Sequence, residues 1–227
     1  MRLLSKSHIL SGLQCVKHLY LEIHHPELGE NSKAAEKAFN IGHQVTAMAR
    51  LSFPDGMLIG YETDIQQALS ATDSALTSHP EDITLFEPAF SFGDAVARTD
   101  ILVVRDGRVA IKEVKSSSSV KPTHITDAAI QAWILQGLGY NVDSVSILHI
   151  NSDFVYQGDG DYSGLFHEAN ITDQIEAIQD DIPGWLDAFR HMLEDGVPEI
   201  STGPHRGGPV CLDRIFHVLS EAPCDSA

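Results

Sequence analysis

The fold follows from one stretch of the chain, Ala97-Arg98-Thr99-Asp100-Ile101-Leu102-Val103-Val104-Arg105-Asp106-Gly107-Arg108-Val109-Ala110-Ile111-Lys112-Glu113-Val114-Lys115. Asp106-Gly107 stands between two β-branched runs and predicts a hairpin with a type I′ turn, in which both central residues have positive φ. The turn sets the register of the two strands. The predicted facing pairs are Val104 with Val109, Leu102 with Ile111, Asp100 with Glu113, and Arg98 with Lys115.

Both faces of this hairpin are apolar near its turn. Side chains alternate between the two faces of a strand, so each face can be read separately. One face carries Leu102, Val104, Val109 and Ile111, and the other carries Ile101, Val103, Ala110 and Val114. Strands that are apolar on both faces are typical of the centre of a sheet that is covered on both sides. The hairpin therefore predicts an α/β fold.

The hairpin becomes ionic at its open end. Residues that face each other across a strand pair lie ~5 Å apart at Cβ, so Asp100 and Glu113 would repel unless a positive group lay between them. A divalent cation is the economical solution, because carboxylates suit Mg²⁺ or Mn²⁺. Lys115 would then stabilise an anion or position a water beside the metal. The alternative is that the two acids only form ion pairs with Arg98 and Lys115 on a solvated sheet edge.

The composition predicts an ordinary globular chain. With 227 residues, 43% hydrophobic and 21% charged, it suits one domain with some appended material. No apolar run approaches the ~20 residues that span a bilayer, so we expect a cytoplasmic protein without a membrane partner. Three cysteines, an odd number, do not suggest a secreted disulfide framework.

Net charge restricts the kinds of partner. A formal charge of −17 is atypical of a protein that binds nucleic acid by simple electrostatics. The charge is unevenly distributed, however, because 98–121 holds six basic residues against three acidic ones. A locally basic region around carboxylates that a metal would neutralise is compatible with a nucleic-acid substrate.

Hydrophobic periodicity places the remaining elements around the hairpin. Helices are predicted from Ser5 or Ser7 to Glu22, from Asn31 or Ser32 to Leu51, and over Asp64–Ser78, Thr123–Leu138 and Ile171–Leu193, the last interrupted near Pro183-Gly184. Strands are predicted over Thr84–Phe90, Val145–Ile150 and Phe154–Tyr156. Glu87, a lone acid in its strand, is expected to approach Arg98 or the metal. Beyond Pro198 we expect irregular structure with a short helix over Asp213–Leu219.

The order of these parts is specific. A helix with His43 is followed by a strand with Glu87, then by Asp100, by Glu113-Val114-Lys115 and by a helix with Gln131. This order resembles the PD-(D/E)XK nuclease superfamily, in particular its RecB-like branch, which includes the CRISPR adaptation exonucleases. The segments 113–121, 129–132 and 148–151 are similar to an uncharacterised bacterial family of RecB-like proteins. The similarity covers most of Leu4 to Pro204.

The resemblance implies a restriction-endonuclease-like mixed β-sheet core flanked by helices, with a helical N-terminal part and an irregular C-terminal tail. It implies a nuclease domain over 1–200 and a tail over 201–227. The implied metal ligands are His43, Asp100, Glu113 and the carbonyl of Val114, and the implied catalytic residues are Asp100, Glu113, Lys115 and Gln131. Family members often carry a Tyr four residues after that glutamine, where this chain has Leu135.

Many relatives also hold an iron–sulfur cluster with one N-terminal cysteine and three near the C-terminus. Cys15 matches the first, and Cys211 and Cys224 are the candidates that remain, because Arg206 stands where the next cysteine is expected. Clusters of this kind normally have four cysteine ligands, so the sequence disfavours a bound cluster and makes the tail a remnant of such a segment.

The sequence thus favours one function over another. It predicts a Mg²⁺- or Mn²⁺-dependent nuclease that hydrolyses phosphodiester bonds, with DNA as its partner. The alternative is a catalytically silent nuclease-like module that binds nucleic-acid ends or a protein partner. The intact Asp100, Glu113 and Lys115 favour the enzyme, whereas the overall acidity and the missing tail cysteine favour the module.

Overall fold

A computed structural model describes residues 3–29, 33–60 and 64–199 of the chain. The helices are α1 (Lys6–Gln14), α2 (Val16–His24), the 3₁₀ turn η1 (Pro26–Leu28), α3 (Lys33–Arg50), α4 (Ile65–Ser78), α5 (Pro122–Gly137), α6 (Thr172–Gln179) and α7 (Ile182–Asp195). The strands are β1 (Leu4–Ser5), β2 (Met57–Leu58), β3 (Asp82–Phe86), β4 (Ala89–Phe92), β5 (Ala95–Arg98), β6 (Ile101–Arg105), β7 (Arg108–Lys115), β8 (Asn141–Ile150) and β9 (Phe166–Asn170). The predicted α/β class is confirmed.

The hairpin forms with the predicted turn and register. Asp106 and Gly107 have φ of 49° and 69°, as a type I′ turn requires. Val104 faces Val109 and Leu102 faces Ile111 across β6 and β7. The strand pairing begins at Ile101, so the acidic end of the hairpin lies where the two strands separate.

The prediction that Arg98 faces Lys115 is wrong. The chain leaves the main sheet before Ile101, and Arg98 belongs to β5, where it faces Ala89 of β4. Together with β1, strands β4 and β5 form a second sheet of three strands in the order β1-β5-β4. Register counting fails here because it assumes that one strand continues without interruption from Ala97 to Arg105.

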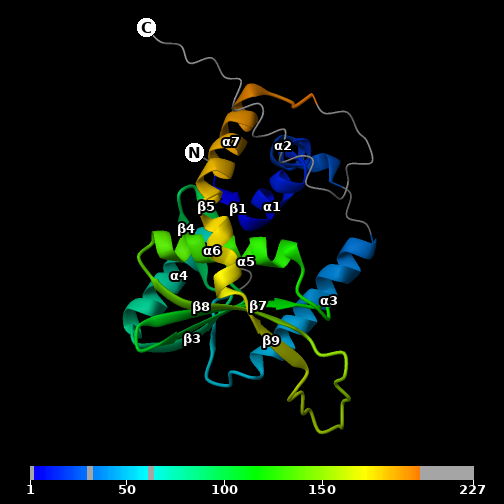
Figure 1. Cartoon of the computed structure of the whole chain (residues 1–227), viewed down its shortest axis with the longest axis vertical. Coiled ribbons are helices and arrows are strands. Elements are labelled where there is room, and N and C mark those ends of the chain that lie inside the picture. The colour runs from blue at the N-terminus through cyan, green and yellow to red at the C-terminus, as the bar shows by residue number, and fades with distance from the viewer. Residues whose placement is uncertain (1–2, 30–32, 61–63, 200–227) are drawn as a thin grey trace.

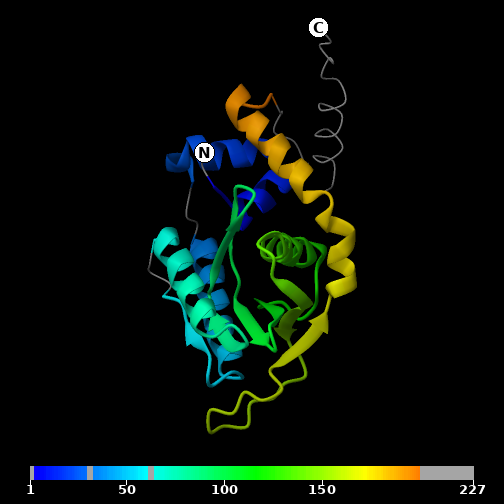
Figure 2. The same cartoon turned by 90° about the vertical axis from the view of Figure 1, so that its left-hand side faces the viewer.

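The hairpin lies at the centre of a six-stranded mixed sheet with the order β2-β3-β6-β7-β8-β9. The pairs β3–β6, β6–β7 and β8–β9 are antiparallel, while β7 and β8 are parallel and are connected through α5. In Figures 1 and 2, α5 crosses over one face of this sheet and α3 lies at its other face. The sequence-based expectation of central strands covered on both sides is confirmed.

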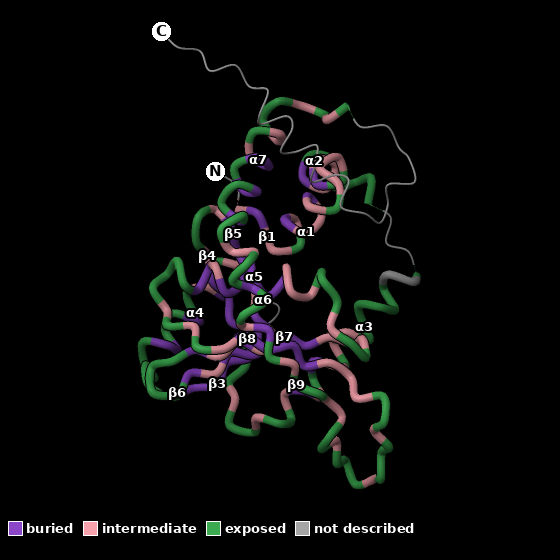
Figure 3. Tube along the Cα trace, viewed as in Figure 1, coloured by how far each residue is buried: buried purple, intermediate pink, exposed green. Residues whose placement is uncertain are grey.

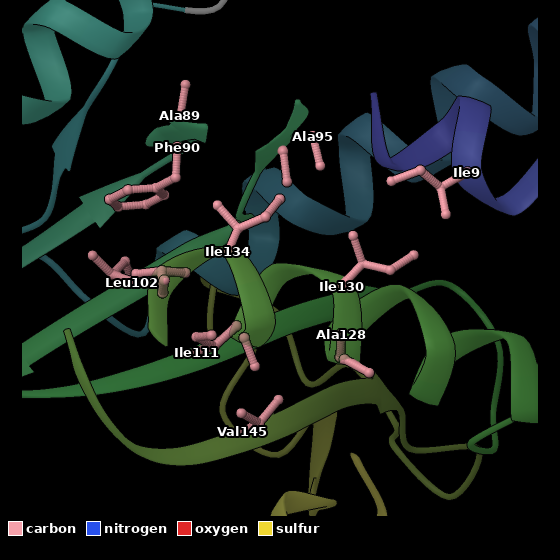
Figure 4. Packing of buried hydrophobic residues seen from close by; sticks show 14 of the residues in the cluster. Ile9, Ala89, Phe90, Ala95, Leu102, Ile111, Ala128, Ile130, Ile134 and Val145 are labelled. Atoms are coloured by element: carbon pink, nitrogen blue, oxygen red, sulfur yellow. The ribbon is translucent and has the colours of Figure 1, made fainter. Parts of the chain in front are cut away.

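The larger core fills the space between the sheet and α5. Leu102, Ile111 and Val145 project from the strands toward Ile130 and Ile134 of the helix (Figure 4), and all five side chains are fully buried. The buried segments in Figure 3 follow the central strands and α5. A smaller cluster on the opposite face joins Ala49 of α3 to Phe86, Ile101, Val114 and Leu148. Apolar burial on both faces therefore holds β6 and β7 in place.

Helix α1 packs against α5 and β5 and brings its first residue to Glu113 near the end of β7. Ser5 caps α1: its hydroxyl accepts from the backbone N–H of His8, and the His8 ring accepts from the N–H of Ser5. Strand β1 pairs in parallel with β5, which anchors the start of this helix. Gly12 allows α1 to approach α7, because a Cβ there would lie 2.7 Å from the Phe189 ring. Lys6, the first residue of α1, is thereby held over the sheet.

Several predicted boundaries differ from the structure. The first helix breaks at Cys15, whose extended backbone separates α1 from α2. The strand predicted over Thr84–Phe90 is divided at Glu87, which has a φ of 56°. Residues 171–193 form two helices that meet at Asp180-Asp181, and Pro183 lies in the first turn of the second, where proline is tolerated.

Two further differences concern strands near the C-terminal part. Phe154–Tyr156 is not a strand but part of the loop between β8 and β9, which projects from the sheet in Figure 1. Strand β9 was not predicted, because its sequence FHEAN has few apolar residues and it lies at the sheet edge. The predicted helix over Asp213–Leu219 lies outside the described residues.

Candidate active site

The open end of the hairpin brings together polar side chains from four parts of the fold. Glu113 and Lys115 share the face of β7 that carries Ile111, so both point toward α5. Asp100 lies directly before β6, and α5 contributes Asp127 and Gln131. The N-terminus of α1 adds Lys6, which is 107 positions away from Glu113 in the sequence.

The side chain of Asp100 is fixed to the end of β7 by a hydrogen bond from the β7 backbone. Its Oδ2 accepts a hydrogen bond of 2.7 Å from the N–H of Val114. Because the N–H and C=O of a strand residue face the same neighbouring strand, the Val114 carbonyl lies on the Asp100 side of β7. Burial, the Glu113 charge and the Glu87 charge raise the pKa of Asp100 to about 8 against the opposing charge of Lys6. The carboxyl groups of Asp100 and Glu113 therefore lie at the same end of the hairpin, and the charge of Glu113 disfavours ionisation of Asp100.

The positive charge required beside these acids comes from lysine ammonium groups. Lys115 Nζ lies 2.6 Å from Glu113 Oε1 and 2.6 Å from Asp127 Oδ2. Lys6 Nζ lies 3.2 Å from Glu113 Oε1, 3.3 Å from Glu113 Oε2 and 3.1 Å from Asp127 Oδ1. Two cations thus alternate with two anions around a ring of Lys6, Glu113, Lys115 and Asp127, which we call the charge ring.

Because the charge ring is mostly buried, its charged groups affect the pKa values of Lys6, Lys115 and Asp127. The Glu113 and Asp127 side chains are only 3% and 7% exposed, whereas Lys6 and Lys115 retain 20% and 21%. Burial favours lower lysine pKa values, but the facing carboxylates outweigh it and raise the pKa of Lys6 and of Lys115. Burial likewise opposes ionisation of Asp127, yet the two lysines lower the pKa of that carboxyl. Both lysines remain cations at neutral pH.

Gln131 links the acids of the charge ring. Its amide Nε2 donates to Glu113 Oε2 at 2.8 Å and to Asp127 Oδ1 at 3.1 Å. The side chain is fully buried, and within the described part of the chain its Oε1 has no hydrogen-bond partner. Leu135, which stands where family members often carry a Tyr, is buried in the core beneath α5 and does not line the site.

Glu87 makes a separate ion pair beside the site. Its carboxylate binds Arg50 of α3, and its backbone carbonyl accepts from Arg98 Nη1 at 3.3 Å. The expected approach of Glu87 to Arg98 therefore involves the main chain. Burial raises the pKa of the Glu87 carboxyl, and the Arg50 charge opposes that rise.

The oxygen donors at the open end suit a hard divalent cation better than any other metal. Asp100, Glu113 and the Val114 carbonyl supply the oxygen atoms. His43 lies on α3 with its ring edge-on to Phe39 at a centroid distance of 4.2 Å. Over residues 3–29, 33–60 and 64–199, no three His, Cys, Asp or Glu side chains converge as a preformed metal site. The structure therefore does not join His43 to Asp100 and Glu113.

The structure describes one of the three cysteines predicted to hold a cluster. Cys15 is a free, partly buried thiol at the junction of α1 and α2, where its N–H donates to the Ser11 carbonyl at 2.8 Å. Cys211 and Cys224 lie outside the described residues. That the protein binds no iron–sulfur cluster stays a prediction.

Two residues of the charge ring were not among the candidates from the sequence. Asp127 had a signal, because it lies four positions before Gln131 and shares its helical face. Lys6 had none beyond its place after a capping serine, and a lysine in the first turn of a helix is common at any protein surface.

Comparisons with known proteins add little to this geometry. No protein-family model matches the sequence, and a search of curated proteins finds no match. Among solved structures, the chain is similar to one titled "Crystal structure of SSO0001", with 13% sequence identity, coverage of 93% of this chain and 96% of that chain, and a TM-score of 0.26. A similarity at that score supports no argument about fold or function.

Proposed function

We propose that the protein is a metal-dependent nuclease that hydrolyses phosphodiester bonds, with DNA as the substrate. The observation that supports this proposal is the placement of Asp100, Glu113 and Lys115 together at the open end of the central hairpin. Neighbouring carboxylates and an ammonium group are the parts that metal-assisted phosphate hydrolysis needs. The PD-(D/E)XK resemblance belongs to the same proposal.

Each side chain has a separate role. When bound, Mg²⁺ or Mn²⁺ would polarise the scissile phosphate and activate a water molecule. Asp100, Glu113 and the Val114 carbonyl would hold that cation. Lys115, which stays protonated, stabilises the negative charge that develops on the phosphate, and Asp127 orients its ammonium group.

Gln131 has a positioning role in this scheme. Its amide holds the Glu113 carboxylate from the α5 side, and its full burial fixes the direction of that contact.

The residues described contain no helix that is long and apolar enough to cross a membrane. A cytoplasmic location is part of the proposal.

A binding module without turnover is the second candidate. The observation in its favour is that Lys6 and Lys115 already offset the charges of Glu113 and Asp127, so charge balance in the ring does not require a metal ion. The formal charge of −17 also opposes broad electrostatic attraction of nucleic acid. Metal binding and cleavage by the same protein separate the two candidates.

The test compares the parent with Lys115→Met on single- and double-stranded DNA in the presence of Mg²⁺ or Mn²⁺. We expect cleavage by the parent only with metal, and a loss of about 100-fold or more in the variant, since one charge-stabilising donor contributes roughly that much. Metal binding, measured by calorimetry, should survive in Lys115→Met because lysine is not a ligand.

Lys112→Met is the matched control. Lys112 lies on the same strand but points to the opposite face, where it pairs with Glu168. Its replacement removes the same charge and should leave cleavage unchanged. A parent that binds metal yet cleaves no nucleic acid would exclude the enzyme and leave the binding module.

A further inference from the structure

Glu113 has no free position for a metal ion in this structure. A carboxylate presents about four lone-pair sites on its two oxygens. Oε1 receives Lys6 and Lys115, and Oε2 receives Lys6 and Gln131, so hydrogen-bond donors fill all of them. A cation that binds Glu113 must therefore displace at least one donor.

Lys6 is the donor that can leave most easily. Its contacts with Glu113, at 3.2 Å and 3.3 Å, are the longest of the set, while Lys115 lies at 2.6 Å and Gln131 at 2.8 Å. Gln131 is fully buried on a core helix and has no room to withdraw. Lys6 is 20% exposed and would still keep Asp127, at 3.1 Å, as a partner.

We infer that Lys6 is a tethered cation that occupies the Glu113 side of the metal site and is displaced from Glu113 when Mg²⁺ or Mn²⁺ binds. Lys6 and the metal compete for one carboxylate, and the ammonium group then remains beside the site on Asp127. The inference rests on the proposed function, since it concerns the same metal site, and it assigns a positioning role to Lys6.

The competition has a physical reason in the burial of Glu113. An anion that is only 3% exposed is costly without a positive partner, so the metal-free protein needs a resident cation there. A lysine at the first position of a capped helix supplies that charge from an anchored backbone, while its four-carbon side chain can rotate aside.

The test is the affinity for Mn²⁺ of the parent and of Lys6→Met, measured by calorimetry in the absence of DNA. Removing the competing ammonium should make Mn²⁺ binding about two- to fivefold tighter, as expected for loss of one partly exposed ion pair. Lys6→Arg restores the charge and should return the affinity toward that of the parent. Lys37→Met, on the exposed surface of α3, removes the same charge elsewhere and should change nothing.

If Lys6 had only a structural role, its removal would not make Mn²⁺ binding tighter. Mn²⁺ binding to Lys6→Met that is equal to or weaker than binding to the parent would overturn the inference. If Lys6→Met does not fold, a crystal structure of the parent with Mn²⁺ decides, because Lys6 Nζ must no longer contact both Glu113 oxygens. Failure of the proposed function appears separately, as a parent that binds Mn²⁺ without cleaving DNA.

Discussion

The two ends of the central hairpin differ in what they bury. At the turn, Val104 faces Val109 and Leu102 faces Ile111, and these side chains are almost fully covered by apolar neighbours. At the open end, a few residues along the same strands, the buried groups are the carboxylates of Glu113 and Asp127 with their lysine partners.

The two ends of the hairpin are expected to differ in what they contribute to stability. Apolar burial at the turn contributes directly to the free energy of unfolding. A buried ion pair contributes little net stability, because the loss of hydration offsets most of its Coulomb attraction. The apolar end is therefore expected to contribute more to stability than the ionic end, and the following changes test that difference.

The largest effect is expected at the apolar end. Ile111→Ala should lower the free energy of unfolding by about 3 kcal/mol, because Ile111 is fully buried between the sheet and α5 and its removal leaves a cavity. Urea unfolding monitored by circular dichroism measures this change. Ile111→Val, which removes one methylene, should cost about 1 kcal/mol. Equal losses for both variants would contradict a cavity mechanism.

An intermediate, pH-dependent effect is expected at the ionic end. Asp100 has a pKa of about 8 in the folded protein, above its ordinary value of 3.8, so folding takes up a proton between these values. Its contribution to stability is fully present below pH 4 and is lost as the pH rises through 8. Metal-free protein should lose at most about 1.4 kcal/mol of unfolding free energy per pH unit from this group.

Asp100→Asn should remove that slope, and urea unfolding at several pH values between 6 and 8.5, with chelator present, compares the two proteins. Asp55→Asn, in an exposed turn, serves as the control and should keep the slope of the parent. Parallel pH profiles for the parent and Asp100→Asn would show that Asp100 does not titrate in this range.

The smallest effect is expected at the turn itself. Gly107→Ala should cost about 1 kcal/mol, because Gly107 has a φ of 69° and alanine is strained there. Space is not the reason, since a Cβ would lie 3.6 Å from the Glu81 carboxylate. Thermal unfolding measures the loss. Gly184→Ala in α7, where a Cβ meets nothing within 4 Å, should instead stabilise the protein.

Local chemistry explains which parts of the fold were predictable. The turn depends on two adjacent residues, and the register of β6 and β7 follows from it by counting. Helices α3, α4 and α5 lie within a few residues of their predicted ranges, because apolar periodicity marks them. Strand β9 and the division at Glu87 were not predictable, since an edge strand and a positive φ leave little trace in hydrophobicity.

The sequence by itself determined that Asp100, Glu113 and Lys115 gather at one end of a central hairpin, because strand alternation and turn geometry act over short distances. Only the tertiary structure decided what surrounds them. Arg98 departs into a second sheet, while α1 and α5 bring Lys6 and Asp127 to Glu113 from distant parts of the chain. Ionic partners at a buried site depend on how helices pack over the sheet, and that packing is set by apolar surfaces such as the contact of Gly12 with Phe189.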